Sequence, residues 1–343
     1  MPARTYLFAI ALLFATPLLL SAQQPEIMHA TLSTQAAGPD FPAQVKLIQE
    51  RNIAGWIGYE IPVAPDVRIG SEGGETRFLE RTEWIDRGTY TDAPKGHDHL
   101  VLLFRLQGGN VSIVQVEDPD KVLDVGGLPF VWFAGVTPVA SIHLLESVAS
   151  KPGSEKLHDS VVFLISLHRS PATVPALAGL ASAAQEKTIR EKAAFWLANQ
   201  RDPQALVALK RLDREATDAD LREKLTFDLT LSHDPAAPGE LIRMAHEDTS
   251  PQVRRQAQFW MATEGGKKVA DDLRTQAATD PEVEVRKSAV FALSRLPADE
   301  AARQLIQVAG SSNDPEVRKQ AVFWLGQSAD PRALDYLTRL LQQ

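Results

Sequence analysis

Residues 314–326 read D-P-E-V-R-K-Q-A-V-F-W-L-G, and this stretch decides the fold because related stretches precede it at a fixed spacing. Its last eleven residues align without a gap with five earlier segments, and each segment starts 32 residues after the previous one. The earlier segments are residues 156–166, 188–198, 220–230, 252–262 and 284–294. Self-similarity at such a period is typical of a solenoid, in which each repeat is a small unit that packs on its neighbours.

Two columns of identical residues run through the segments. Arginine recurs every 32 residues, and His158 holds the same place in the first segment. Phenylalanine recurs at the same step in all of the segments. The arginines are Arg190, Arg222, Arg254, Arg286 and Arg318, and the phenylalanines are Phe163, Phe195, Phe227, Phe259, Phe291 and Phe323. We call these the Arg column and the Phe column.

Each segment has the apolar periodicity of an α-helix, and a second helix is expected after it in each unit. In the last segment the apolar residues at i, i+4, i+7 and i+8 form one helix face: Val317, Ala321, Trp324 and Leu325. Most of the second helices begin at a Ser-Pro or Asp-Pro pair, which is typical of an N-cap followed by proline. Gly265-Gly266 replaces the proline in one unit and indicates a looser turn. Residues 154–343 are therefore predicted to form an all-α solenoid of about six helical hairpins.

The motif in residues 314–326 resembles the HEAT repeat, and in particular the short bacterial type called the PBS-lyase HEAT-like repeat. The resemblance covers residues 157–343. It implies an α-α superhelix, and the families that share it include scaffolds, lyases that attach bilins and a metal-dependent hydroxylase. The hydroxylase relatives use several His-Glu pairs, whereas this chain has only His246-Glu247, so their iron site is not reproduced. Nothing beyond the generic repeat supports a bilin lyase.

For the Arg column, the resemblance implies a structural role. In HEAT repeats an arginine at this place typically bonds loop carbonyls and a nearby aspartate of the stack. Asp248 and Asp280 lie six residues before Arg254 and Arg286. We therefore interpret Arg190, Arg222, Arg254, Arg286 and Arg318 as a structural ladder, since a regularly repeated charge-assisted hydrogen bond fits a stacking role.

The Phe column is the candidate binding surface. At 100° per residue, Phe323 falls about 140° from the centre of the apolar face of its helix. The family usually has a polar or small residue there, on the helix that lines the concave wall. The six phenylalanines are therefore predicted to form an apolar stripe that binds a partner along the concave face. The alternative is that each phenylalanine is buried between neighbouring repeats. Three tryptophans fall at the core angle and are expected to pack inside: Trp196, Trp260 and Trp324.

The N-terminal half has a different pattern, which predicts a small α+β domain over residues 41–153. Residues 42–51 have the pattern of an amphipathic helix, and residues 139–150 of a helix that leads into the repeats. Three strands are predicted at residues 54–61, 100–106 and 111–116, the last two joined by a hairpin turn. Residues 69–76 are expected to be a loop, and the Gly-Gly-Leu-Pro stretch in 123–133 a packing junction. The domain is expected to cap the first repeat, whose apolar end would otherwise meet water.

The start of the chain resembles an export signal. Arg4 precedes an apolar run at residues 7–20, and small residues at 21–22 offer a cleavage point. We expect residues 1–22 to be a signal peptide and residues 23–40 a flexible mature N-terminus, which implies a periplasmic or secreted protein. The chain has no cysteine, so it has no disulfides and no thiolate metal sites.

Catalytic motifs are not evident. His97 and His99 would lie on one face of a strand, but a third ligand is lacking, so no metal is expected. There is no Gly-x-Ser-x-Gly, phosphate loop or His-Glu-x-x-His. With a net charge of −8, binding to nucleic acid is not expected. The expected function is a cell-envelope scaffold that binds a protein or peptide, without enzyme activity, cofactor or small-molecule substrate. The alternative is an enzyme or an accessory subunit, with a site between the N-terminal domain and the first repeats.

Overall fold

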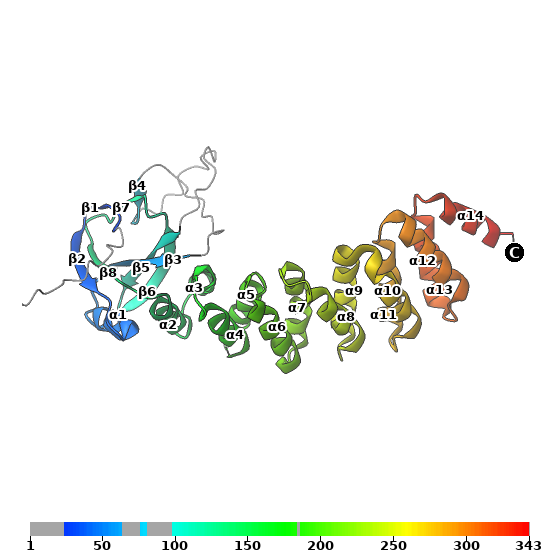
Figure 1. The fold of residues 1–343 in the computed structure, drawn as a ribbon, viewed down its shortest axis with the longest axis horizontal. Helices are drawn as coiled ribbons and strands as arrows, with labels where there is room; N and C mark the ends of the chain where they lie inside the picture. Colours follow the sequence, from blue (N-terminus) through cyan, green and yellow to red (C-terminus); the bar gives the residue numbers. More distant parts are fainter. Residues whose placement is uncertain (1–23, 64–75, 81–97, 184–185, 343) are drawn as a thin grey trace, which may run out of the picture.

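A computed structural model describes residues 24–63, 76–80, 98–183 and 186–342. An α+β head lies at one end, and a curved row of paired helices extends from it to the C-terminus (Figure 1). The predicted fold class, an α+β domain followed by an α-solenoid, is therefore confirmed. The expected signal peptide, most of the loop at 69–76 and His97 lie outside the described residues.

The head is built on a five-stranded mixed sheet with the order β2-β8-β3-β5-β6. Its strands are β2 (Thr31–Ala36), β3 (Gly55–Pro62), β5 (His99–Gln107), β6 (Asn110–Glu117) and β8 (Pro129–Ala134). β3, β5 and β6 are antiparallel neighbours and match the three predicted strands, whereas β8 runs parallel to both β3 and β2. Almost every residue of β3 and β5 is buried, so this sheet is the core of the head.

A second, smaller sheet covers one face of the first. It has the order β1-β7-β4, with parallel pairs between β1 (Ile27–Met28), β7 (Val122–Asp124) and β4 (Thr76–Phe78). An apolar cluster fills the space between the sheets: Trp56, Val101, Leu103, Leu123, Val125, Phe130 and Trp132. The head is thus layered on this side by sheet on sheet.

Two sequence expectations about the head are corrected by these strands. Residues 31–36 belong to the segment expected to be flexible, but they pair along their whole length with β8. The apolar pattern of a strand is missing there because all six side chains are exposed on an edge strand. Residues 123–133, expected to be a packing junction, contain parts of β7 and β8, with Gly126 and Gly127 at positive φ in the turn between them.

The other face of the large sheet packs against helices and joins the head to the repeats. These helices are α1 (Phe41–Glu50) and α2 (Pro138–Ala149), as the sequence predicts. Tyr59 of β3 and His168, at the end of the first repeat helix, both bond the Ser141 hydroxyl of α2 at 2.8 Å. A β-bridge between Val63 and His168 adds a backbone link. One continuous apolar core therefore runs from the head into the solenoid.

The solenoid consists of six helical hairpins over its described residues. The hairpins are α3 (Glu155–Leu167) with α4 (Thr173–Ala183), α5 (Lys187–Ala198) with α6 (Pro203–Glu215), α7 (Ala219–Leu231) with α8 (Ala237–Glu247), α9 (Pro251–Gly265) with α10 (Ala270–Thr279), α11 (Val283–Ser294) with α12 (Ala298–Ser311), and α13 (Pro315–Gly326) with α14 (Pro331–Leu340). The odd-numbered helices from α3 to α13 carry the repeated segments and stack side by side. In the fourth hairpin the Gly265-Gly266 turn leads into a short 3-10 helix, η1 (Gly266–Val269), before α10.

None of the helices in the described part of the chain is long and apolar enough to cross a membrane.

Candidate functional site

The Phe column lies at the surface of the odd-numbered helices. Phe323 is 54% exposed and Phe227 is 37% exposed, and the other four phenylalanines are half-buried. The side chains that share a helix with Phe323 but point inward, Val317 and Ala321, are fully buried. None of the six rings is enclosed between repeats in the way that the alternative interpretation requires.

The three tryptophans, which are half-buried against the core, also join the phenylalanines of neighbouring helices. The Trp260 ring lies 5.0 Å from Phe227 of the preceding odd-numbered helix and 4.9 Å from Phe259 of its own helix. Trp196 makes the corresponding two contacts with Phe163 and Phe195. Trp324 makes them with Phe291 and Phe323. Each tryptophan is half-buried and therefore belongs to the surface layer that the phenylalanines form.

In the repeats without tryptophan, the residue that follows the column phenylalanine differs from one helix to the next. Ala292 stands in the tryptophan place on α11, and there Phe259 and Phe291 stack directly with centroids 6.5 Å apart. Asp228 stands in that place on α7, and no ring contact between Phe195 and Phe227 is recorded across it. We call the two groups of connected rings, which are separated at Asp228, the aromatic stripe: Phe163, Trp196 and Phe195, and then Phe227, Trp260, Phe259, Phe291, Trp324 and Phe323.

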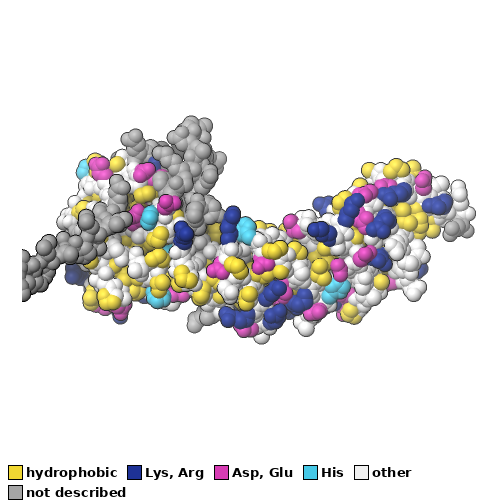
Figure 2. All heavy atoms as spheres, in the orientation of Figure 1, with side chains coloured by type: hydrophobic (Ala, Val, Ile, Leu, Met, Phe, Trp, Pro, Cys, Tyr) yellow, Lys and Arg dark blue, Asp and Glu magenta, His cyan; other side chains and the backbone are white. Residues whose placement is uncertain are grey.

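The aromatic stripe can bind apolar or flat groups along several repeats. Partly exposed rings offer apolar area that is favourable to remove from water, at about 25 cal/mol per Å². The indole N–H groups of Trp260 and Trp324 are buried and have no hydrogen-bond partner among the described residues. On the face shown in Figure 2, hydrophobic side chains lie among charged ones over the middle repeats. The surface therefore combines apolar contacts with polar groups that a ligand can reach at its edges.

The Arg column links each repeat to the next one. Arg254 Nε and Nη2 donate to the two carboxylate oxygens of Asp280 at 2.8 and 3.0 Å, while Nη1 donates to the main-chain oxygen of Asp248 at 2.8 Å. The side chain of Asp248 pairs in turn with the preceding arginine, Arg222. Asp248 and Asp280 thus each present the carboxylate to the arginine of one repeat and the carbonyl to the arginine of the next. The pairs are Arg190–Asp218, Arg222–Asp248, Arg254–Asp280 and Arg286–Asp314.

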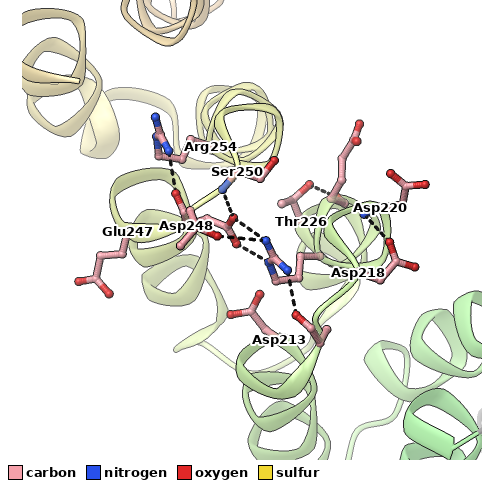
Figure 3. Close-up of polar contacts among 12 residues, drawn as sticks. Asp213, Asp218, Asp220, Thr226, Glu247, Asp248, Ser250 and Arg254 are labelled. Carbon is pink, nitrogen blue, oxygen red and sulfur yellow. Dashed lines mark hydrogen bonds and ion pairs between the residues drawn. The ribbon is translucent and has the colours of Figure 1, made fainter. Parts of the chain in front are cut away.

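These aspartates also hold the start of the next odd-numbered helix. Asp248 Oδ1 accepts a hydrogen bond from the backbone N–H of Ser250 at 2.7 Å, as the close-up in Figure 3 shows. The hydrogen bond that Arg254 donates to Asp280 raises the pKa of the Arg254 guanidinium, and the hydrogen bond that Asp314 accepts from Arg286 lowers the pKa of Asp314. Arg318, in the last repeat, donates to the Ser312 carbonyl at 2.7 Å and has no aspartate partner among the described residues. The arrangement is that of a stacking contact rather than of a ligand site.

The described residues of the head form two polar clusters. His29 Nδ1 lies 3.0 Å from Asp124 at the mouth of a cleft of about 420 Å³, whose lining also includes Phe78, Glu80, Gly126 and Gly127. Tyr59, Ser141 and His168 form the second cluster, which is fully buried where the head meets the repeats. Burial lowers the pKa of His168 to about 4 and raises that of Tyr59. Ser141 is therefore enclosed and has no route to a substrate.

Metal ligation has no support in the described part of the chain. No group of three or more His, Asp or Glu side chains is placed there to hold an ion. His99 is exposed at the start of β5, and His97 is outside the described residues, so the His97–His99 pair is not tested.

The comparisons with known proteins agree with this geometry. The family model described as HEAT repeats matches residues 238–314 and 270–343, and the model described as PBS lyase HEAT-like repeat matches residues 189–214. Residues 189–214 and 238–343 of the helical part are therefore similar to HEAT repeats. Among curated proteins, no match was found.

Two solved structures with similar helical arrangements are enzyme-related. Human deoxyhypusine hydroxylase in complex with glycerol is 20% identical with a TM-score of 0.27, and the match covers 58% of this chain and 77% of that one. The complex of CpcE and CpcF of phycocyanin lyase from Nostoc sp. PCC7120 is 19% identical with a TM-score of 0.33, over 56% and 77% of the two chains. The likeness concerns the fold alone.

The expectation from the sequence that the chain is not an enzyme is wrong. The repeat was taken as a binding architecture, but a hydroxylase and a lyase are among the HEAT-like structures that resemble this chain. A helical solenoid therefore does not exclude catalysis, because chemistry depends on the side chains that a fold presents rather than on the fold.

Proposed function

We propose that this chain is a scaffold of the cell envelope that binds a segment of a partner protein along the aromatic stripe. The observation that carries the proposal is the exposure of Phe227 and Phe323 within a connected series of rings. Apolar side chains are favoured inside a protein, and a binding role explains why phenylalanines recur at the surface of the stack every 32 residues. HEAT repeats generally mediate protein interactions, which agrees with this function.

The aromatic stripe suits an elongated ligand. It crosses all of the odd-numbered helices from α3 to α13, so a compact small molecule would contact only a fraction of it. An extended or helical peptide segment would bury several rings at once, and burial of aromatic side chains dominates the energy of most protein interfaces. The concave position of the stripe is part of this proposal.

The experiment is a pull-down from periplasmic extract with the purified protein as bait. The double variant Phe227→Ser/Phe323→Ser removes the two most exposed rings of the stripe, while Val207→Ser/Leu334→Ser removes exposed apolar side chains elsewhere, 59% and 69% exposed. Circular dichroism checks that both variants are folded. A partner that wild type and the control retain, and the stripe variant loses by more than tenfold, supports the proposal. Equal recovery by all three proteins contradicts it.

Export to the periplasm is a separate part of the proposal, and it rests on the apolar run at residues 7–20 behind Arg4. N-terminal sequencing of the protein recovered from the periplasmic fraction tests it. A mature chain that begins at about residue 23 is the expected result, and an intact chain found only in the cytoplasm contradicts it.

A further inference from the structure

Asp228 is the one departure from the aromatic stripe that carries a charge. Its side chain is 4% exposed, and Oδ2 is buried with no hydrogen-bond partner among the residues that the structure describes. A buried carboxylate without a partner is costly, because it loses its hydration without a compensating bond. The folded protein therefore keeps an unsatisfied carboxyl oxygen at a position of the repeat where neighbouring repeats place a ring.

The repeat places this carboxylate between two phenylalanines. On α5, α9 and α13 the tryptophan contacts the phenylalanine of the preceding odd-numbered helix and the one beside it in its own helix. Asp228 holds the same place on α7, so its neighbours in the stripe are Phe195 and Phe227. The tryptophans of the stripe on either side are Trp196 and Trp260.

The charged groups nearby pair with one another rather than with Asp228. Lys224, one turn earlier on α7, and Lys187 of α5 both pair with Glu191 of α5, at 3.2 and 3.8 Å. Burial raises the pKa of Asp228 to about 7, Lys224 opposes this rise and Glu191 adds to it. Among the described residues no group donates a hydrogen bond to Asp228 Oδ2, which can therefore accept one from a ligand.

We propose that Asp228 and the rings of Phe195 and Phe227 bind an arginine side chain of the partner segment. A guanidinium supplies the N–H donors and the positive charge that the carboxylate lacks, and its flat face stacks on an aromatic ring, which attracts cations. This site rests on the proposed function, because it lies within the aromatic stripe. It adds that the partner is recognised by one basic residue among apolar ones.

The spacing of the repeats sets the expected sequence of the partner. Neighbouring packed helices lie about 8–10 Å apart, and a peptide in the polyproline II conformation has three residues per turn and advances about 3.1 Å per residue. In that conformation, a peptide that runs along the stripe with its arginine at Asp228 would present apolar side chains on the same face about three residues before and after it. These apolar residues would meet Trp196 on one side and Trp260 on the other.

The test begins with a display library of random twelve-residue peptides selected on the purified wild-type protein, on Asp228→Asn and on Phe227→Ser/Phe323→Ser. Asp335→Asn is the matched control, since it removes the same charge from an exposed position on α14. We expect wild type and the control to enrich peptides with one arginine flanked by apolar residues. Asp228→Asn should keep the apolar enrichment and lose the arginine.

The strongest selected peptide is then measured by fluorescence anisotropy, with its arginine intact or replaced by citrulline, a neutral side chain of the same shape. Citrulline should weaken binding to wild type more than tenfold and leave binding to Asp228→Asn unchanged within twofold. Because binding requires the ionised carboxylate, affinity for the arginine peptide should rise from pH 5 to pH 8 in wild type only. Retention of the arginine preference by Asp228→Asn overturns the inference and leaves the proposed function standing. Selection of no peptide by wild type, or equal selection by the Phe variant, overturns both.

Discussion

Replacement of Asp228 by asparagine tests whether the aromatic stripe contains an unpaired buried carboxylate. Burial raises the pKa of this group from its ordinary value of 3.8 to about 7 in the folded chain. Above pH 4 the unfolded chain releases the proton, while the folded chain retains it until about pH 7. The group therefore lowers stability progressively as pH rises between these two values.

The magnitude follows from the difference between the two pKa values. Each unit corresponds to about 1.4 kcal/mol, so the full cost of the ionised carboxylate approaches about 4 kcal/mol above pH 7. About 2.5 kcal/mol of this cost accumulates between pH 5 and pH 8. Asparagine has the same shape and no charge, so its own cost does not change over that range. The stability of Asp228→Asn relative to wild type should therefore increase by about 2.5 kcal/mol from pH 5 to pH 8.

The assay is urea unfolding followed by circular dichroism at pH 5 and pH 8, with amide hydrogen exchange in α7 as the local measure of opening. Asp335→Asn serves as the control, because its exposed carboxylate should give the same difference from wild type at both pH values. Parallel shifts of Asp228→Asn at pH 5 and pH 8 would refute the reasoning. They would mean that the carboxylate is solvated or paired in solution and titrates near its ordinary value.

Three further predictions concern the ladder, the junction and the stripe. Arg254→Ala should reduce the free energy of unfolding by about 3 kcal/mol because it leaves a buried aspartate unpaired. Arg318→Ala, at an exposed position, should reduce it by less than about 1 kcal/mol. Urea unfolding of both variants measures the difference. Burial lowers the pKa of His168 from 6.5 to about 4, so the unfolded chain binds a proton more readily and stability falls as pH drops from 6.5 toward 4. The urea midpoint of His168→Gln should therefore change less than that of wild type between pH 7 and pH 5. Phe227→Ser should leave the melting temperature within a few degrees of wild type while it abolishes partner capture, since the ring is already 37% exposed.

The repeats could be predicted from the sequence because two columns of residues at one spacing constrain every helix at once. The helical angle of Phe323 correctly placed it away from the core, since that angle depends only on position along one helix. For Trp324 the angle correctly indicated a contact with the core, but not the contact with the neighbouring repeat that leaves it half-buried. A tryptophan side chain is long enough to reach the neighbouring repeat, and its contact with Phe291 depends on the stack rather than on its own helix.

The head was less predictable for a physical reason. β2 has no apolar alternation because all its side chains are exposed, and its only strong interaction is the backbone ladder with β8, about 100 residues away in the chain. Asp228 was visible as an exception among the tryptophans, but its lack of a partner depends on the surrounding side chains. Sequence periodicity identifies the place of a residue in a repeat, whereas the satisfaction of its polar atoms requires the packed structure.

Site-specific photo-crosslinking in cells tests the central claim most directly. A photoreactive phenylalanine analogue replaces Phe227 or Phe323 in the aromatic stripe, and Val207 or Leu334 outside it, all four being exposed. The account predicts that both stripe positions crosslink to the same partner protein and that the two control positions do not. Crosslinking to a shared partner from Val207 and Leu334, with none from the stripe, would contradict it.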